Sequence, residues 1–174
     1  LPIVWYGNDD QKKKYLSKLS SGELLGSYAL TEPSAGSDAL SGTTTAVLNE
    51  EGTHYILNGQ KIYVTNGGWC EVAVTFASVD GKYTAFILDK DCDGWVVGEE
   101  EKKLGIKGSS TVTFFYEDCK VPIENVLGNV GEGGPIAFNV LYVGRYKLGV
   151  TTGAGAKYVI DAALEYATER KQFN

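Results

Sequence analysis

The 174-residue chain has no methionine and a single histidine, and it begins at Leu1. A chain of this kind is expected to be a processed protein or a piece of a longer one. Its cysteines, Cys70, Cys92 and Cys119, are odd in number and form no C-x-x-C pair, so we expect free thiols and neither disulfides nor a metal site. His54 lies in a strand-like stretch and is predicted to be an ordinary strand residue.

Basic residues are outnumbered by acidic ones, 16 to 22. A net charge of −6 excludes a general surface for nucleic acid or anionic membranes, because such surfaces need a basic footprint. Arg145 and Lys147 interrupt the longest uncharged stretch, so no integral membrane segment is expected. Hydrophobic residues make up 43% and charged residues 22%, which is typical of a globular protein and excludes disorder.

Glycine, in contrast, is abundant at 22 residues, which indicates many tight turns. The chain begins with a short predicted helix, in which Asp9 and Asp10 precede a basic stretch that ends at Gly22. A strand-rich part follows, and the dipeptide Asn58-Gly59 between two apolar runs predicts a hairpin. The predicted strands are 43–48, 55–57, 61–65, 71–79, 83–88, 95–97 and 112–116.

The last part changes to helical spacing. From residue 134 to about 172 apolar residues recur every three or four positions, and Pro135 suits a first helical turn. Four glycines inside this helix predict close helix–helix contact: Gly144, Gly149, Gly153 and Gly155. The predicted fold class is α+β. It comprises an antiparallel β-barrel or sandwich of about seven or eight strands, preceded by a short helix and followed by a long α-helix.

Two stretches have the composition of a binding site. Residues 28–38 leave a strand and enter a loop of small residues, where hydroxyls and backbone amides could hold a phosphate or the polar edge of a heterocycle. Alternatively, Pro33 and Gly36 serve turn geometry alone. Residues 61–68 form a strand that ends in a tight turn, and Tyr63 could stack on a planar ligand or simply belong to the core.

These two stretches carry a family resemblance, together with six further motifs in the same order. The chain resembles the acyl-CoA dehydrogenases, in their middle β-domain and the first long helix after it. The resemblance assigns residues 1–22 to the end of an N-terminal helical domain, 23–128 to the middle domain and 129–174 to that helix. The shared motifs lie at 11–24, 30–38, 57–67, 103–111, 121–128, 131–133, 144–145 and 166–173.

The resemblance implies FAD as cofactor and an acyl-CoA as substrate. The implied reaction is α,β-dehydrogenation to the trans-2-enoyl-CoA, in which a carboxylate takes the α-proton while hydride passes from the β-carbon to the flavin. An electron-transfer flavoprotein would then accept the electrons. A dimer or tetramer is expected, in the bacterial cytoplasm or, in a eukaryote, the mitochondrial matrix.

The resemblance also implies site residues. The loop and strand would contact the flavin, Arg170 the FAD diphosphate of a neighbouring protomer, and Phe173 the adenine side. Most relatives have tryptophan where this chain has Tyr63. The implied cofactor-binding residues are Tyr28, Leu30, Thr31, Gly36, Ser37, Tyr63, Val64, Thr65, Arg170, Gln172 and Phe173, and the implied substrate-binding residues are Ser37, Tyr142 and Arg145.

The chain lacks an obvious catalytic base. Between Glu132 and Asp161 there is no carboxylate, and Gly144 stands where some relatives place the catalytic glutamate. No catalytic residue is therefore predicted in this chain, which is expected to be inactive alone. Two alternatives stay open: a flavin monooxygenase or acyl-carrier-protein dehydrogenase of the same fold, and a non-catalytic β-barrel module for binding or assembly.

Overall fold

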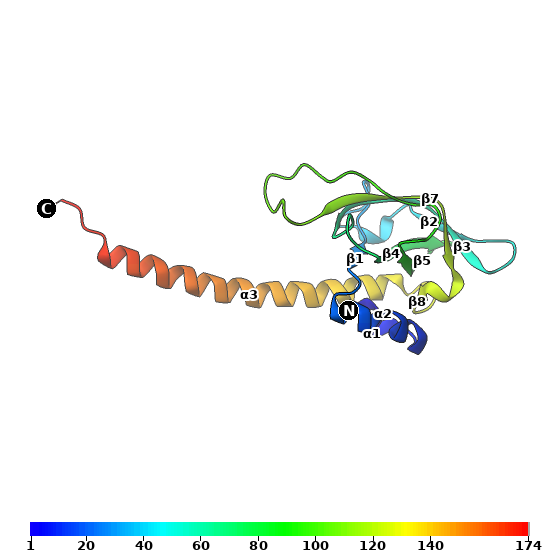
Figure 1. Ribbon diagram of the computed structural model, residues 1–174, viewed down its shortest axis with the longest axis horizontal. Helices are drawn as coiled ribbons and strands as arrows, with labels where there is room; N and C mark the ends of the chain where they lie inside the picture. Colours follow the sequence, from blue (N-terminus) through cyan, green and yellow to red (C-terminus); the bar gives the residue numbers. More distant parts are fainter. Residues whose placement is uncertain (174) are drawn as a thin grey trace. The chain divides into compact units, whose positions relative to one another are not determined.

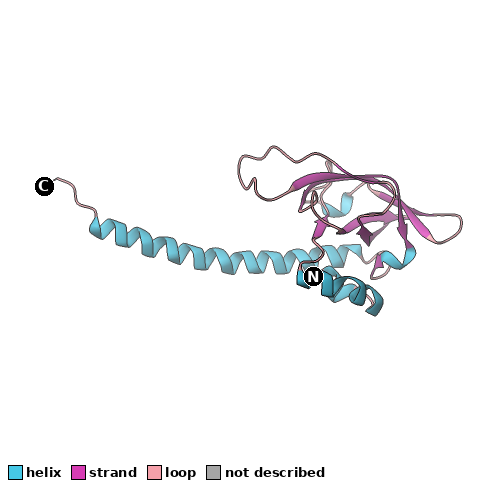
Figure 2. Cartoon of the chain, viewed as in Figure 1, coloured by secondary structure: helices cyan, strands magenta, loops and turns pink. Residues whose placement is uncertain are grey.

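The computed structural model describes residues 1–173, and Figure 1 follows the course of the chain. The chain divides into two compact units, Leu1–Ala137 and a second that begins at Phe138, and each is described by itself. Among the described residues, the first unit holds two α-helices, two 3-10 helices (η1 Ala39–Ser41 and η2 Ile123–Asn125), eight strands and the first turn of the long helix. Figure 2 colours the helices and strands of the chain. The elements are α1 Pro2–Tyr6, α2 Asp9–Ser21, β1 Gly26–Ala29, β2 Thr45–Leu48, β3 His54–Thr65, β4 Val72–Val79, β5 Lys82–Asp89, β6 Trp95–Val97, β7 Thr111–Pro122, β8 Val126–Leu127 and α3 Gly133–Glu169.

Helix α2 confirms the predicted N-terminal helix, although its cap is Asn8. The Asn8 side chain accepts a hydrogen bond from the N–H of Gln11, and the Gln11 side chain accepts one from the N–H of Asn8. Gly22, with φ of 80°, ends the helix in the left-handed conformation that favours glycine. The buried Tyr15 hydroxyl donates to Asp89 of β5 at 2.9 Å, which fixes α2 against the sheet.

The eight strands form one sheet in the order β6-β7-β3-β2-β4-β5-β8, with β1 paired to β4. Most neighbours are antiparallel, as predicted, but β1 and β2 each run parallel to β4. A single core cluster draws side chains from β1 to β5 and from β7, so the sheet curves around one interior. The strand number and the mixed α+β class are confirmed.

The predicted hairpin at Asn58-Gly59 is wrong. Strand β3 runs straight through this dipeptide and pairs with β7 on both sides of it, with a bulge between Leu57 and Gly59. A Cβ at Gly59 would lie 2.6 Å from the Thr44 hydroxyl oxygen, and the residue has φ of 146°. Glycine is required here for a bulge and a close approach, which use the same residue types as a turn.

Helix α3 confirms the predicted long helix. Gly133, Ile136 and Ala137 at its start are buried, and a Cβ at Gly133 would lie 2.8 Å from backbone atoms of Tyr83 and Thr84. From Gly144 to Phe173 every described residue is exposed, and a Cβ at the four interior glycines would meet no described atom within 4 Å. Their predicted role in helix–helix contact stays a prediction.

The remaining sequence predictions concern cysteine, histidine and membranes. All three cysteines are free thiols, and His54 is the first residue of β3, as predicted. Within residues 1–173, no helix is long and apolar enough to cross a membrane, and no cluster of potential metal ligands occurs. The domain boundaries predicted after residues 22 and 128 stay predictions.

Candidate functional site

The loop that follows β1 is joined to β3 by the backbone. The N–H of Ile62 donates to the carbonyl of Thr31 at 2.8 Å, so the predicted binding loop lies directly beside the strand that carries Tyr63. Glu32 and Ala35 exchange two backbone hydrogen bonds of 3.1 Å, which make the turn through Pro33 tight. The structure therefore brings together the two stretches that the sequence singled out.

A buried ion pair also joins the loop to β3. The Lys61 ammonium lies 2.6 Å from Glu32 Oε1, and the two side chains are 0% and 1% exposed. The other carboxylate oxygen accepts hydrogen bonds from the N–H and the hydroxyl of Thr43, at 2.6 and 3.0 Å. The N–H of Thr44 adds contacts of 3.2 Å to both oxygens. Glu32 thus ties the start of the loop to its end and to β3.

Burial and the opposite charge of the partner act in opposite directions on the pKa values of Glu32 and Lys61. Burial raises the pKa of Glu32, but the Lys61 ammonium and the donors of Thr44 and Thr43 outweigh it, and the pKa lies below its ordinary value. Burial lowers the pKa of Lys61, and the attraction of Glu32 only partly offsets that effect. Glu32 is accordingly held as a carboxylate near neutral pH.

Tyr63 has an unusual backbone conformation. The strand register shifts between Lys61 and Val64, and Tyr63 lies in this bulge with φ of 56°. A bulky residue in the left-handed region costs about 1–3 kcal/mol and indicates a functional constraint. The bulge leaves the Tyr63 side chain 64% exposed while the neighbouring Val64 is buried in the core. Such a bulge re-aims a side chain, as bulges next to functional sites commonly do.

The loop after β1 and the end of β3 contain unused hydrogen-bonding groups. Within residues 1–173, the hydroxyls of Thr31, Ser37 and Thr65 have no hydrogen-bond partner, and neither has the N–H of Gly36. Gly36, Ser37 and Thr65 are exposed. An exposed aromatic ring on β3 and free donors in the adjoining loop are the groups that suit a planar, polar heterocycle.

The other cofactor residues predicted in this unit contribute in different ways. Leu30 and Val64 are buried, so only their backbone is available to a ligand. Tyr28 is half-buried, packs edge-on against Phe76, and donates its hydroxyl to the carbonyl of Ala137 at 3.2 Å. Burial raises the pKa of Tyr28, so its hydroxyl stays protonated.

The residues predicted on the second unit pair locally. Arg145 lies over the ring of Tyr142 at 5.9 Å. Arg170 lies just beyond α3 and donates to the Tyr166 hydroxyl at 2.6 Å. Gln172 and Phe173 follow the helix, and Phe173 is 98% exposed. The structure therefore shows Arg170 held by its own helix.

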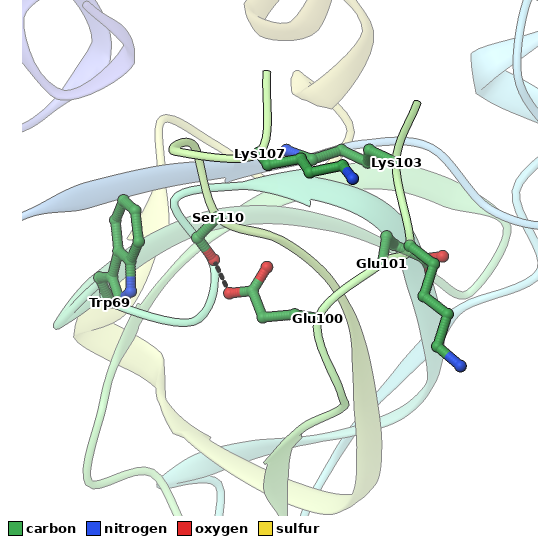
Figure 3. A pocket seen from close by; sticks show the side chains of 7 residues that line it. Trp69, Glu100, Glu101, Lys103, Lys107 and Ser110 are labelled. Atoms are coloured by element: carbon green, nitrogen blue, oxygen red, sulfur yellow. Dashed lines mark hydrogen bonds between the residues drawn. The ribbon is translucent and has the colours of Figure 1, made fainter. Parts of the chain in front are cut away.

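A separate cavity of about 590 Å³ adjoins the turn that follows Thr65. Figure 3 shows the Ser110 hydroxyl directed at Glu100, to which it donates at 2.5 Å. Ser110 also accepts from the N–H of Gly68 at 2.9 Å, so these groups attach one loop to another. The lining residues are Trp69, Glu100, Glu101, Lys102, Lys103, Lys107 and Ser110.

Sequence reasoning missed Glu32 and Lys61 as parts of the site. Alternation could not have shown this, because residues 61 and 64 lie three apart and would face opposite sides of a regular strand. Only the bulge between Lys61 and Val64 lets both side chains be buried. The pairing of Lys61 with Glu32 could not be read from spacing either, because the two residues lie 29 positions apart.

Comparison with known proteins identifies the fold around this site. The family model for the acyl-CoA dehydrogenase middle domain matches residues 27–119, which is more than half of the chain. The chain belongs to this family. A "Probable acyl-CoA dehydrogenase" of Bacillus subtilis is 55% identical over 99% of the chain. An acyl-CoA dehydrogenase of Bacillus anthracis, solved in complex with FAD, is 53% identical over 99% of the chain with a TM-score of 0.93.

The chain is much shorter than these relatives. It spans 29% of the Bacillus subtilis protein and 30% of the Bacillus anthracis structure. A prolyl acyl carrier protein oxidase, AnaB, shares the fold with a TM-score of 0.92, and at 34% identity the chain covers 47% of it.

Proposed function

We propose that this acyl-CoA dehydrogenase chain carries the flavin-contacting part of an FAD-dependent enzyme that oxidises an acyl-CoA to the trans-2-enoyl-CoA. The observation that carries the proposal is the exposed Tyr63 ring, fixed in a strained bulge beside a loop with unused donors. The family membership and the FAD complex of the Bacillus anthracis relative support the cofactor.

The donor set of the first unit fits such a cofactor. The free groups of Thr31, Gly36, Ser37 and Thr65 would bind the polar edge of the isoalloxazine, and the Tyr63 ring would cover its face. Tyr28, Leu30 and Val64 would contribute packing and backbone. FAD, when bound, supplies the two-electron acceptor for the oxidation of the acyl chain.

The second unit would supply the remaining contacts. The guanidinium of Arg170 is suited to a diphosphate because its fork can pair with two phosphate oxygens. Only Nη1 of Arg170 donates to the Tyr166 hydroxyl, so the other N–H groups of the guanidinium would be available to the diphosphate. Gln172 and Phe173 would lie near the same cofactor. Ser37, Tyr142 and Arg145 would contact the acyl-CoA.

The whole protein would need further groups and partners. Helix α3 has no carboxylate between its first turn and Asp161, and Gly144 stands where some relatives place the catalytic glutamate. We therefore propose that the base for the α-proton lies outside this chain, which is then inactive alone. Electrons would leave to an electron-transfer flavoprotein, and a neighbouring protomer would complete the FAD site in a dimer or tetramer. The compartment would be the bacterial cytoplasm or the mitochondrial matrix.

Titration with FAD tests the proposal. Flavin fluorescence should be quenched on addition of the chain, because the Tyr63 ring stacks on it. Tyr63→Asn should weaken FAD binding about 10-fold while the chain remains folded, because asparagine tolerates the left-handed conformation but offers no ring. Tyr146→Asn, on the exposed surface of α3, is the matched control. Absence of quenching by the unaltered chain would refute the proposal, and turnover of an acyl-CoA would refute its inactivity.

A second candidate follows from the likeness to the prolyl acyl carrier protein oxidase. The acyl group would then arrive on a carrier protein in place of free coenzyme A. Competition distinguishes the two: an acyl-CoA should perturb the spectrum of chain-bound FAD at lower concentration than the corresponding acyl-carrier protein. The reverse order would favour the second candidate.

A further inference from the structure

We propose that Glu32 and Lys61 are positioning residues, which set the distance between the donors of residues 31–37 and the Tyr63 bulge and so determine how tightly the flavin is held. The inference rests on the proposed function. Neither side chain reaches the exposed face, so both act through the backbone segments that they join.

The ion pair of Glu32 and Lys61, which we call the clamp, joins the loop to the bulge. Glu32 follows Thr31, which carries one free donor, and Lys61 lies two residues before Tyr63. The 2.6 Å contact between their side chains therefore fixes the loop and the bulge at adjacent points. The 2.8 Å hydrogen bond from Ile62 to Thr31 lies directly beside it. Loss of the ion pair leaves that backbone bond and the 3.5 Å hydrogen bond from the Thr44 hydroxyl to the Gln60 carbonyl to join the loop to β3.

The charges of this pair have a role that apolar side chains could not fill. An apolar pair of similar volume would commonly stabilise the protein at least as well as a buried ion pair. An apolar pair, however, could not bind the N–H groups of Thr43 and Thr44, which need an acceptor. The Glu32 carboxylate thus joins the start of the loop to its end at Thr43 and Thr44. Directional hydrogen bonds can fix these segments in one arrangement, whereas non-directional packing cannot.

Gly42 leaves the space that the Glu32 carboxylate occupies. A Cβ on Gly42 would lie 2.6 Å from Glu32 Oε1 and 3.0 Å from Cδ. Gly42 has an ordinary φ of −60°, so its backbone conformation does not require glycine. The missing side chain leaves room for the Glu32 carboxylate.

The test compares single and double variants of the chain by two readouts, flavin fluorescence on FAD titration and hydrogen exchange of the Ile62 amide. Glu32→Gln and Lys61→Met should each weaken FAD binding about 10-fold or more and speed exchange at Ile62, because each leaves an unpaired group in the core. The double variant removes both charges and should regain most of the thermal stability. It should still bind FAD weakly, because the Thr43 and Thr44 donors keep a poorer acceptor. Gly42→Ala, which displaces the carboxylate without removing a charge, should act in the same direction.

Leu127→Ala is the matched control, because it destabilises the core from β8, which contributes no residue to the clamp. It should lower the thermal stability and leave the FAD affinity of the folded chain within about 2-fold. Recovery of FAD affinity together with stability in the double variant would show a merely structural role and overturn the proposal. If the unaltered chain does not quench flavin, the proposed function fails. The Ile62 amide then decides the positioning role by itself, and unchanged exchange in both single variants overturns it.

Discussion

At the scale of single residues, the site contains two features that lower the stability of the folded chain. Tyr63 takes a left-handed conformation that disfavours bulky side chains, and Lys61 buries an ammonium entirely. Both lie within three residues on β3, where the register with β7 shifts. Each would be relieved by an ordinary strand sequence, so we infer that binding, and not stability, explains this part of β3.

The Glu32 carboxylate makes acid stability a test at this scale. Its pKa is lower in the folded chain than the unfolded value of about 4.3, so the folded state gains stability from it above that pH. This stability is lost as the pH falls through the folded pKa. The unfolding free energy of the unaltered chain should therefore fall more steeply between pH 5 and pH 3 than that of Glu32→Gln/Lys61→Met, measured by urea titration. Parallel curves would contradict the assignment.

At the scale of elements, the glycines of α3 fall into two classes. Gly133 lies against the backbone of Tyr83 and Thr84, whereas Gly149 faces open space among the described residues. A side chain at the first position must displace a strand. A side chain at the second only improves the intrinsic helix propensity.

Alanine at each of these positions should give opposite effects. Gly133→Ala should lower the unfolding free energy of the first unit by about 1–3 kcal/mol through overpacking, measured by urea titration. Gly149→Ala should stabilise the helix by about 1 kcal/mol, measured as a gain in helical circular dichroism in dilute solution. If Gly149 serves close helix contact between copies, the gain should disappear at high protein concentration. A Gly133→Ala chain as stable as the unaltered one would refute the close approach.

Local chemistry explains which elements the sequence could predict. Apolar and β-branched runs gave β4, β5 and β6 within about two residues, and the helical spacing gave α3. Strand β8 has only two residues, and its identity depends on pairing with Ala85 and Phe86. The Asn58-Gly59 dipeptide satisfies either a turn or a bulge, and only the pairing of β3 with β7 decides between them. The clamp of Glu32 and Lys61 is likewise a contact between distant segments.

At the scale of the whole molecule, the two units differ in what stabilises them. The first has a continuous core, whereas residues 144–169 of α3 form a helix whose described side chains are all exposed. Helical stability in proteins comes mainly from tertiary packing, and four interior glycines lower the intrinsic helix propensity of this segment. The exposed apolar side chains include Tyr146, Leu148, Val150, Tyr158, Val159, Ile160 and Leu164.

Hydrogen exchange at two protein concentrations tests this difference. At low concentration, amides of residues 144–169 should exchange orders of magnitude faster than those of β4 and β5, because local opening of the helix exposes no core. At high concentration their protection should rise, because a second copy can cover the apolar side chains. The protection of β4 and β5 is the internal control and should not change. Equal protection of both units in dilute solution would show that the helix is stable by itself, and concentration-independent exchange would remove the support for self-association.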